Sequence, residues 1–394
     1  MVDPVPRLED LEVERGTRVL LRADFNVPLH DGKIEDDLRI TAALPTIEYL
    51  RHRGAEIVCC SHLGRPKGKV DPRFSLAPVA RRLSELLGID VALSPEVAGF
   101  ESMDRAESLH PGQVMLIENL RFDPGEEAND AAFAANLTQL GDVYVDDAFG
   151  AAHRAHASIV GPPLVLPAAG GRLLAREVEV LGGLLDAPKH PFVAILGGVK
   201  VSDKLGVIDA LLQRCDTLLI GGAMAFTFLV AKGGHVGDSL VQEDQIDHCR
   251  ALLATGRIEI PTDVVVAADM TADARTQHVR AGSIPDGMKG LDIGPETAGH
   301  YADVIAGANT VLWNGPMGVF ELEPFAAGTR TVAGAVADCR GFTVIGGGDS
   351  ASAVAHFGLA DRIDHVSTGG GASLELIELG DLPGLQALRK GTRR

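Results

Sequence analysis

Arginine and histidine residues recur just after apolar, strand-like segments in the first half of this 394-residue chain. Three such segments are followed by His62 with Arg65, by Arg121 and by Arg154. In parallel α/β sheets, ligands bind beyond the carboxyl ends of the strands, where several loops meet. The planar fork of Arg binds carboxylate and phosphate groups through paired hydrogen bonds. The spacing therefore predicts that these side chains converge on one small anion.

Ion pairing within the chain is the alternative for these arginines. Each could pair with a nearby carboxylate such as Glu118 or Asp147. This explains a single Arg well, but it explains three of them together with His62 poorly. Arg39 is weaker evidence by itself. It follows Asp36 by three residues on a predicted helix, which is typical of a surface pair.

In the second half of the chain, strand-like segments end in glycines. The segment Phe192–Leu196 leads into Gly197 and Gly198, and Lys200 and Lys204 follow. Glycines let backbone N–H groups approach phosphate, and a helix that follows presents its positive N-terminus. Lys200 and Lys204 would share one face of that helix. The pattern predicts a phosphate site that lacks the GxxxxGK[ST] motif, and two solvated lysines are the alternative.

A second glycine-rich turn, Gly346–Ala351, follows the strand-like segment 342–345. It fits the GxGxxA pattern of dinucleotide-binding turns, but the next segment ends in glycines and not in a ribose-binding acid. Asp349 lies in this turn, where its carboxylate would repel phosphate unless Mg²⁺ lay between them. We therefore expect Asp349 to contact Mg²⁺, with helix N-capping as the alternative. Glu321 follows another strand-like segment and is a weaker candidate for a ribose hydroxyl.

The elements that position these residues alternate between strand and helix along the whole chain. This alternation predicts βαβ units and mostly parallel sheets that are covered on both faces. A Pro- and Gly-rich segment, 161–171, predicts a linker, and helical spacing of leucines over 172–185 predicts a helix joining two lobes. A further helix is predicted over 75–87. The predicted strands are 18–23, 56–60, 90–93, 114–117, 142–146, 192–196, 217–220, 263–267, 309–313, 342–345 and 364–367.

Composition narrows the class of protein. The length suits two domains, and the net charge of −18 argues against a nucleic-acid or anionic-membrane surface. Five cysteines without regular spacing predict free thiols in a reducing compartment, and we expect the cytoplasm. Neither a signal peptide nor a long apolar run is visible, so no membrane partner is expected.

Taken together, these motifs resemble the phosphoglycerate kinase family. The resemblance runs from about Arg22 to Gly384, in segments 22–28, 61–66, 118–122, 147–150, 153–156, 197–204, 313–321, 346–350 and 365–375. It implies an α/β fold of two Rossmann-like parallel-sheet domains joined by a helix, with an interdomain cleft. By this resemblance, residues 1–171 with 380–394 bind 3-phosphoglycerate or 1,3-bisphosphoglycerate. Residues 172–186 form the joining helix, and residues 187–379 bind MgATP or MgADP.

The resemblance also implies the roles of individual residues, motif position by motif position. On the substrate side it places Asp24, Phe25, Asn26, Arg39, His62, Leu63, Gly64, Arg65, Arg121 and Arg154. On the nucleotide side it places Lys204, Gly294, Asn314, Glu321, Gly347, Gly348, Asp349 and Ser350, with Asp349 as the metal contact. The catalytic residues would be Arg39, Lys200 and Gly370, which meet the phosphoryl group in transit. The substrate's own carboxylate is the nucleophile, so no protein base is required.

The chain departs from the family's pattern at three positions. Val199, Asp146 and Ser350 stand where alanine, asparagine and threonine are common. Ser350 keeps the hydroxyl group. Asp146 adds a negative charge near the basic residues, which could weaken substrate binding.

Two other functions compete with this interpretation. An NAD-dependent dehydrogenase would use the 346–351 turn, but it leaves the lysines and the arginines unexplained. A catalytically silent anion- or nucleotide-binding protein should lack a catalytic position, yet Arg39, Lys200 and Asp349 are all present. We therefore expect a monomeric, Mg²⁺-dependent ATP:3-phosphoglycerate phosphotransferase of glycolysis, with two lobes that close by hinge bending.

Overall fold

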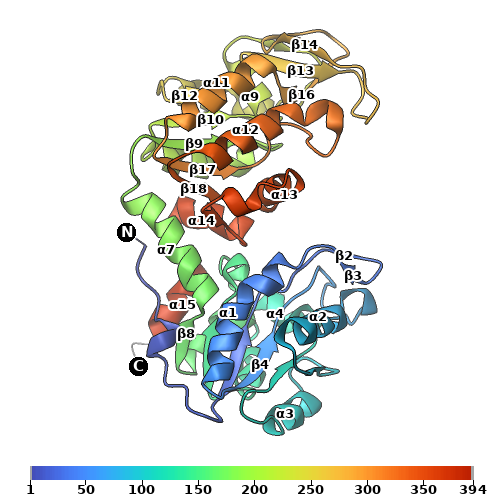
Figure 1. The fold of residues 1–394 in the computed structure, drawn as a ribbon, viewed down its shortest axis with the longest axis vertical. Helices are drawn as coiled ribbons and strands as arrows, with labels where there is room; N and C mark the ends of the chain where they lie inside the picture. Colours follow the sequence, from blue (N-terminus) through green and yellow to red (C-terminus); the bar gives the residue numbers. More distant parts are fainter. Residues whose placement is uncertain (1, 392–394) are drawn as a thin grey trace. The chain divides into compact units, whose positions relative to one another are not determined.

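The computed structural model describes residues 2–391 and contains two compact units. Within the described range, unit 1 comprises residues 2–182 and 379–391, and unit 2 comprises residues 183–378. Each unit is built around one parallel six-stranded sheet (Figure 1). The division falls inside the long helix α7 (Arg172–Asp186), where the sequence predicts a joining helix. The buried positions of α7 include Leu174, Val178, Leu181 and Leu184, which follow the predicted helical spacing.

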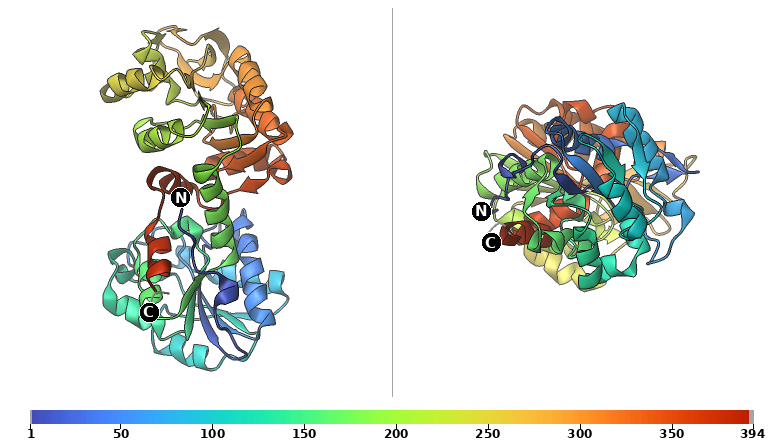
Figure 2. Two further views of the ribbon diagram at one scale, coloured as in Figure 1. Left: turned by 90° about the vertical axis from the view of Figure 1, so that its left-hand side faces the viewer. Right: turned by 90° about the horizontal axis from the view of Figure 1, so that it is seen from below.

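The sheet of unit 1 has the strand order β5-β6-β4-β1-β7-β8, and every neighbouring pair is parallel. Its strands are β1 (Arg18–Arg22), β4 (Glu56–Cys60), β5 (Val91–Leu93), β6 (Val114–Leu116), β7 (Val143–Asp146) and β8 (Ala168–Gly170). Helices cover both faces of this sheet (Figures 1 and 2). They are α1 (Leu38–His52), α2 (Ala77–Leu87), α3 (Phe100–Glu107), α4 (Pro124–Ala128), α5 (Ala131–Thr138), α6 (Ala157–Val160) and α15 (Pro383–Gly391). A short hairpin pairs β2 (Leu29–His30) with β3 (Lys33–Ile34).

One prediction for unit 1 is wrong. The segment 161–171 is not a linker, because β8 lies within it and pairs with β7 at the edge of the sheet. The predicted strands over 18–23, 56–60, 90–93, 114–117 and 142–146 are confirmed to within one residue at each end. Their continuous apolar character reflects burial on both faces. Val19, Leu20 and Leu21 at the centre of the sheet are fully buried.

The main sheet of unit 2 has the order β12-β10-β9-β17-β18-β19, again with all pairs parallel. Numbered along the chain, this is the 3-2-1-4-5-6 order of the doubly wound fold, whose order reverses between β9 and β17. Its strands are β9 (Phe192–Leu196), β10 (Thr217–Ile220), β12 (Ile258–Glu259), β17 (Thr310–Asn314), β18 (Phe342–Ile345) and β19 (His365–Val366). Its helices are α8 (Leu205–Leu212), α9 (Ala225–Ala231), α10 (Ile246–Leu253), α11 (Pro295–Ala306), α12 (Ala327–Asp338), α13 (Gly348–His356) and α14 (Gly370–Leu379).

A second correction concerns the predicted strand 263–267. It is a strand, β13 (Asp263–Ala267), but it lies outside the parallel sheet. It is the middle strand of a small antiparallel sheet, between β14 (Gln277–Arg280) and β16 (Lys289–Ile293). Beside it, β11 (His235–Val236) pairs with β15 (Ser283–Ile284). Phe226, Val264 and Ile284 belong to the apolar core of this region.

The C-terminal helix α15 belongs to unit 1. Its Leu385 and Leu388 are buried, and the Gly384 amide donates a hydrogen bond to the Ala152 carbonyl at 2.9 Å. Arg389 donates to the Asp3 carbonyl at 2.9 Å, which ties the two ends of the described chain together. Residues 379–391 therefore belong to the same compact unit as residues 2–182.

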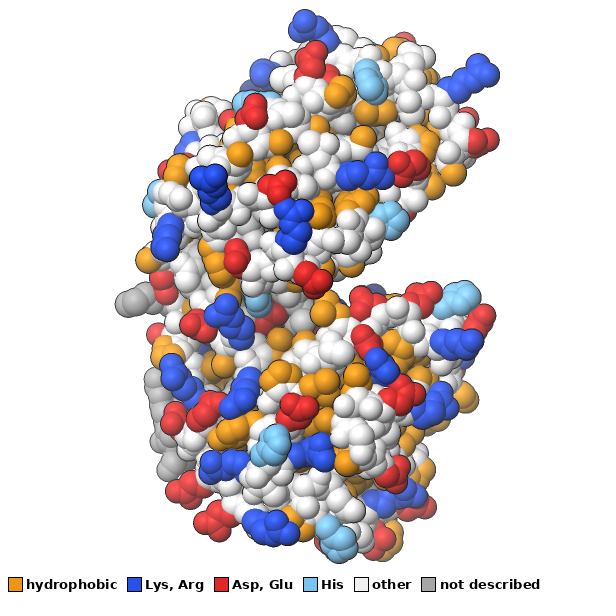
Figure 3. Space-filling model, viewed as in Figure 1, with side chains coloured by type: hydrophobic (Ala, Val, Ile, Leu, Met, Phe, Trp, Pro, Cys, Tyr) orange, Lys and Arg blue, Asp and Glu red, His pale blue; other side chains and the backbone are white. Residues whose placement is uncertain are grey.

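Charge is distributed over both units. On the face shown in Figure 3, Lys and Arg side chains are interspersed with Asp and Glu. Among residues 2–391, no helix has the length and apolar character needed to cross a membrane. The five cysteines are all free thiols.

Candidate active site

In unit 1, the predicted substrate residues follow four adjacent strands, β6, β4, β1 and β7. The loop after β1 carries 24–26, the loop after β4 carries 62–65, and Arg121 and Arg154 follow β6 and β7. Arg39 comes from the first turn of α1. Because all these strands are parallel, their carboxyl ends meet at one edge of the sheet. The topology therefore brings the predicted substrate residues to the same side of unit 1.

A chain of hydrogen bonds joins three of these loops. The Asn26 side-chain oxygen accepts a hydrogen bond from the Gly64 amide at 2.8 Å. The Gly64 carbonyl in turn accepts one from Arg121 Nη1 at 2.8 Å. Leu63 is held by Asn119, whose side chain bonds both its amide and its carbonyl. The Phe25 amide donates to Ser61 Oγ at 2.9 Å. These bonds fix the turn that holds His62 and Arg65 relative to Arg121.

Arg39 is oriented by the loop after β1. Its Nη1 lies 3.3 Å from Asp24 Oδ2 and donates to the Asn26 carbonyl at 3.0 Å. The Asp36–Arg39 surface pair does not form; Asp36 instead accepts a hydrogen bond from the Leu38 amide. Burial opposes ionisation of Asp24, but Arg39 and the other nearby cations hold the pKa of its carboxyl below the usual range. Asp24 is therefore a buried anion that holds Arg39 in place.

His62 is buried between charged neighbours. Its Nδ1 lies 3.1 Å from Nη2 of Arg22, the last residue of β1, which is fully buried. Burial lowers the pKa of His62 well below its usual value, and the nearby arginines act in the same direction. His62 is therefore neutral at pH 7.

Arg65 and Arg154 are both exposed. Among the described residues, neither side chain has a hydrogen bond or ion pair with another part of the chain. The proposed carboxylate partners are engaged elsewhere. Glu118 accepts hydrogen bonds from Ser75 and the Leu76 amide, and Asp147 caps the N-terminus of α7.

Besides Arg39, one predicted arginine, Arg121, forms an ion pair with a described residue. Its Nε lies 3.1 Å from the half-exposed Glu127, and not from Glu118. The pairing alternative therefore holds for Arg121 with a different partner, while two exposed cations remain available for an anion.

Asp146 lies beneath these loops at the end of β7 and is fully buried. Its Oδ1 accepts a hydrogen bond from the Ala148 amide, but its Oδ2 has no partner among the described residues. Burial raises the pKa of Asp146 to about 6, although Arg22 acts in the opposite direction. The Asp146 carboxyl therefore gains or loses its charge around pH 6, well above its usual pKa.

In unit 2, the predicted phosphate site lies where the strand order reverses, between β9 and β17. The Lys204 ammonium donates to the Gly197 carbonyl at 2.6 Å, and to Asn314 O and Oδ1 at 3.0 and 2.5 Å. Gly197 packs directly on the turn at Gly315, where a side chain would collide with backbone. Burial lowers the pKa of Lys204 to about 8. Lys204 thus bridges the turns after β9 and β17.

Lys200 differs from Lys204 in position and in environment. It does not share a helix with Lys204, because the chain becomes helical only at the short turn 202–204 and then in α8. The prediction of a shared helical face is therefore wrong. Lys200 is exposed, and no described residue pairs with its side chain. Its ammonium is free to meet an incoming anion.

The turn after β18 packs against the start of α14. A side chain on Gly370 would lie 2.8 Å from the Gly347 Cα atom, so the two backbones make close contact there. Ser350 is buried and its hydroxyl accepts a hydrogen bond from the Gly315 amide at 2.5 Å, so it joins two turns. Asp349 is exposed in the first turn of α13 with Gly348. It does not cap this helix, because the N-cap residue is Gly347.

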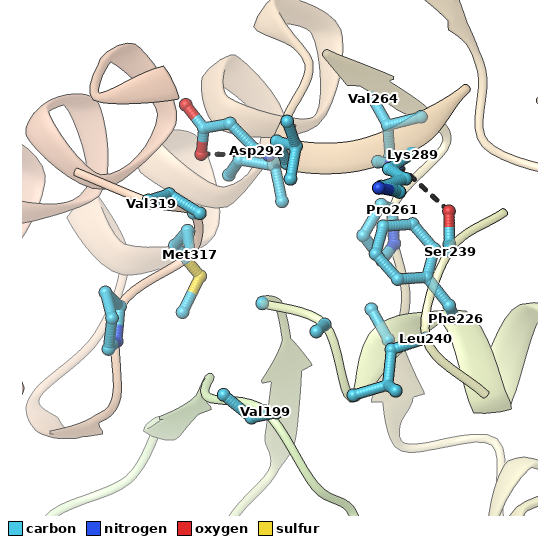
Figure 4. Close-up of a pocket in the computed structure, with 18 of the residues that line it drawn as sticks. Val199, Phe226, Ser239, Leu240, Pro261, Val264, Lys289, Asp292, Met317 and Val319 are labelled. Carbon is cyan, nitrogen blue, oxygen red and sulfur yellow. Dashed lines mark hydrogen bonds between the residues drawn. The ribbon is translucent and has the colours of Figure 1, made fainter. Parts of the chain in front are cut away.

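An apolar pocket of about 430 Å³ opens beside the turn at 198–199. Figure 4 shows Phe226, Leu240, Val264 and Met317 around it. Gly318 and Val319 also line it, so the exposed Glu321 lies two residues beyond its wall. A flat ring with apolar faces, such as a nucleobase, suits a pocket of this size and lining. Gly294 is buried at the N-cap of α11, next to the lining residue Ile293.

Sequence reasoning missed most of this pocket. Its walls come from α9, the loop at 238–240 and the antiparallel sheet, none of which carries a charged motif. Asp292 also lines it, and burial raises the pKa of this carboxyl to about 7. Leu240 and Met270 lie at the rim of this pocket, where 50 % and 57 % of their surface is exposed. Two segments singled out from the sequence, 197–204 and 313–321, do supply part of the lining.

Comparisons with known proteins give one family. The family model described as phosphoglycerate kinase matches residues 8–379. The chain is 53 % identical over 390 residues to the phosphoglycerate kinase of Deinococcus radiodurans, covering 98 % of this chain and 95 % of that protein. It is 55 % identical over 380 residues to the one of Roseiflexus castenholzii, covering 95 % and 96 %.

Solved structures agree with the sequence relatives. The phosphoglycerate kinase of Coxiella burnetii matches with a TM-score of 0.87 and 39 % identity, covering 98 % of this chain and 99 % of that one. The phosphoglycerate kinase of Pyrococcus horikoshii OT3 matches with a TM-score of 0.88 and 34 % identity, with the same coverage.

Proposed function

This chain belongs to the phosphoglycerate kinase family, and we propose that its two groups of strand-end residues are the substrate and nucleotide sites of one enzyme. The enzyme is a phosphotransferase of glycolysis. It transfers a phosphoryl group reversibly between 1,3-bisphosphoglycerate and ADP, giving 3-phosphoglycerate and ATP. One observation supports the assignment of residues best. In a chain of net charge −18, exposed cations without partners in the described chain lie at the carboxyl ends of parallel strands in both units.

In unit 1, the phosphate and carboxylate of 3-phosphoglycerate are bound by Arg65, Arg121, Arg154 and His62. The two exposed arginines lose no protein partner when they turn to the substrate, so binding costs little within the chain. Arg121 already has its Nη1 on the Gly64 carbonyl, and its fork is held ready for an anion. Asp24 and Asn26 accept hydrogen bonds from the substrate or orient the residues that bind it.

In unit 2, the nucleobase occupies the apolar pocket and the phosphates lie over the turns at 197–200 and 347–350. Glu321 binds the ribose, just beyond the pocket wall. Lys204 already bridges two of the turns and presents its charge at the phosphate position. The backbone amides of Gly347 and Gly348, at the start of α13, add the positive end of a helix.

Mg²⁺ fits Asp349. Mg²⁺ keeps several waters and binds through one or two carboxylates together with substrate phosphates. A single exposed carboxylate beside the phosphate turn meets that need, and the described residues hold no group of three metal ligands. When bound, Mg²⁺ neutralises charge on the nucleotide phosphates. Asp349 is also near enough to Lys204 to favour the charged form of the lysine.

The chemical step requires positioning and charge neutralisation, because the attacking group is the substrate's own carboxylate. Arg39 is held by Asp24 at the substrate side, and Lys200 is unpaired at the nucleotide side. Both meet the phosphoryl group as it moves, together with the backbone amides of the turn at Gly370. Charge that develops on the transferred group is stabilised by these fixed donors.

Because the two ligands are bound by different units, transfer requires that the units approach one another. We propose that this hinge bending occurs when both ligands are bound, and that it excludes water. Small-angle scattering tests it, with both ligands together expected to compact the protein more than either alone. An unchanged profile with both ligands would contradict this part of the proposal. We further propose a monomer in the cytoplasm.

The deciding experiment is ATP-dependent phosphorylation of 3-phosphoglycerate, coupled to a dehydrogenase that consumes the acyl phosphate and NADH. Turnover that needs both Mg²⁺ and 3-phosphoglycerate supports the assignment. Folded protein that binds MgADP but shows no turnover would contradict it and point to a different acceptor acid.

A further inference from the structure

Arg22 is the largest charged side chain buried within unit 1. It is the last residue of β1 and is fully buried, directly beneath the loops that carry the substrate residues. Its guanidinium makes three different contacts. Nε donates to Ser158 Oγ at 2.9 Å, Nη1 donates to the Ala23 carbonyl, and Nη2 lies 3.1 Å from His62 Nδ1. The fork is therefore fixed on three sides, with one arm aimed at the His62 ring.

The contact with His62 determines which ring nitrogen carries hydrogen. A guanidinium has five donors and no acceptor, and it stays protonated in proteins. At 3.1 Å the hydrogen bond must therefore run from Arg22 to a lone pair on Nδ1. Asp24 Oδ1 lies 3.9 Å from Nδ1, which is too long for a hydrogen bond. Nδ1 carries no hydrogen, so the hydrogen of the neutral ring is on Nε2.

The surrounding charges favour the same state. Arg22 from β1, Arg39 from α1 and Arg121 from the turn after β6 oppose protonation of His62, as does burial. Asp24 is the charged neighbour that favours protonation. Its carboxylate is already engaged by Arg39 and by the Asn26 amide. Among residues 2–391 no acceptor bonds to Nε2.

We propose that Arg22 is a positioning residue that fixes His62 as the neutral Nε2–H tautomer, so that His62 binds the anionic substrate as an uncharged hydrogen-bond donor. This inference rests on the proposed function of unit 1 as the substrate site. The positive charge then comes from Arg65, Arg121 and Arg154. His62 contributes one hydrogen bond of fixed direction, donated by Nε2. A neutral ring does not lose a proton as the pH rises through the usual His range, so its contact with substrate persists there.

The direct test is nitrogen NMR of protein labelled with ¹⁵N at histidine, with the His62 signals assigned by their loss in His62→Gln. We expect one unprotonated and one protonated ring nitrogen, with the hydrogen on Nε2, unchanged from about pH 5.5 to about pH 8.5 and on addition of 3-phosphoglycerate. Hydrogen on Nδ1, or a transition near the usual His pKa, would overturn the proposal. This readout does not depend on turnover. Failure of the proposed function would instead appear as no response of any unit 1 signal to 3-phosphoglycerate.

Arg22→Lys tests the positioning role, because it keeps the buried charge but loses the fork. We expect His62 to begin to titrate in this variant and the KM for 3-phosphoglycerate to rise about tenfold, as for loss of one charge-assisted hydrogen bond. The KM for MgATP, which reports on unit 2, should not change. A His62 that remains non-titrating with hydrogen on Nε2 would show that Arg22 is not responsible.

A second pair of variants keeps the proposal testable if Arg22→Lys does not fold. The amide of Gln reaches the position of Nε2, whereas the shorter amide of Asn reaches that of Nδ1. We therefore expect His62→Gln to keep most of the affinity for 3-phosphoglycerate and His62→Asn to lose about tenfold or more. The reverse order would mean that the substrate uses Nδ1, and it would refute the proposal.

Discussion

Lys204 and Asn314 are joined by two hydrogen bonds, from the lysine ammonium to the backbone oxygen of Asn314 at 3.0 Å and to its side-chain oxygen at 2.5 Å. Asn314 is the last residue of β17, and Lys204 lies just before α8 in the segment that follows β9, so the pair spans the reversal of strand order in unit 2. The third ammonium hydrogen goes to Gly197, so the lysine uses all its donors within the chain. Asn314 Nδ2 continues the network to the Gly346 carbonyl at 2.7 Å. The Lys204 ammonium therefore links, directly or through Asn314, the glycine turns that follow β9, β17 and β18.

The pKa of Lys204, about 8, makes nucleotide binding depend on pH. Lys204 is charged below this pKa and loses its charge as the pH rises through it, so attraction for phosphate is lost. We expect the Kd of MgADP to rise above about pH 8, by at most tenfold per pH unit for one proton. Lys204→Arg keeps its charge and should flatten the profile. Parallel profiles for the two proteins by calorimetry would contradict this prediction.

Lys200→Ala should lower kcat strongly, by about 100-fold or more, because the exposed ammonium neutralises charge on the moving phosphoryl group. The Kd of MgADP should change much less, since Lys204 and the backbone amides remain. The coupled assay and calorimetry measure the two quantities. Lys232→Ala, another exposed lysine of unit 2, is the matched control. Near-normal turnover of Lys200→Ala would exclude a catalytic role.

Asp349→Asn should separate the effect of the metal on binding from the effect of the nucleotide alone. The variant should weaken binding of MgADP by about tenfold, while metal-free ADP binds as well as before or better, because a repulsive charge is gone. Titrations of ADP with and without Mg²⁺ measure this difference. Asp303→Asn, an exposed acid on α11, serves as the control. Equal losses with and without Mg²⁺ would show that Asp349 does not contact the metal.

Arg65→Gln and Arg154→Gln should each raise the KM for 3-phosphoglycerate by about tenfold or more, as expected for a lost charge-assisted contact. Thermal stability should be nearly unchanged, because neither side chain is bonded to another described residue. Arg81→Gln, an exposed arginine on α2, should change neither quantity. If stability falls together with affinity, these arginines are structural.

Asp146→Asn should stabilise the protein above about pH 6. The pKa of Asp146 is raised from 3.8 to about 6, so its contribution to stability is present at low pH and is lost as the pH rises through about 6. Asn imitates the protonated acid. The free energy of unfolding of the variant should exceed that of the parent by up to about 3 kcal/mol at about pH 7.5, and by little at about pH 4.5.

Denaturant titrations at both pH values check this prediction. Exposed Asp90→Asn should give no such difference. Buried Asp147 and Asp292 also titrate near neutral pH, but they are the same in both proteins, so the difference isolates Asp146. An equal effect at both pH values would mean that folding does not raise the pKa of Asp146.

The sequence predicted most of the parallel framework because buried strands need continuous apolar runs. It failed at β8, where Ala168, Ala169 and Gly170 carry none of the β-branched residues that mark a strand. It recognised β13 as a strand but not its sheet, because local pattern does not specify a partner strand. The parallel topology alone explains why the predicted arginines meet at one sheet edge.

Side-chain partners could not be predicted in the same way. Arg39 contacts Asp24, 15 positions away in the chain, and not Asp36, its neighbour on the helix surface. Lys204 is bonded across 110 positions to Asn314, and Arg22 reaches His62 across 40. Contacts of this kind depend on strand order, which is set by the whole sheet. For the same reason the walls of the apolar pocket could not be assembled from separate segments.

The return of α15 to unit 1 has a consequence for the order in which the protein is made. Unit 2 is one continuous stretch of chain, whereas unit 1 lacks its last helix until every residue of unit 2 has been synthesised. Leu385 and Leu388 fill buried positions in unit 1 that stay empty during that interval. On the ribosome, unit 2 is therefore the first to have its complete sequence, and unit 1 is completed last.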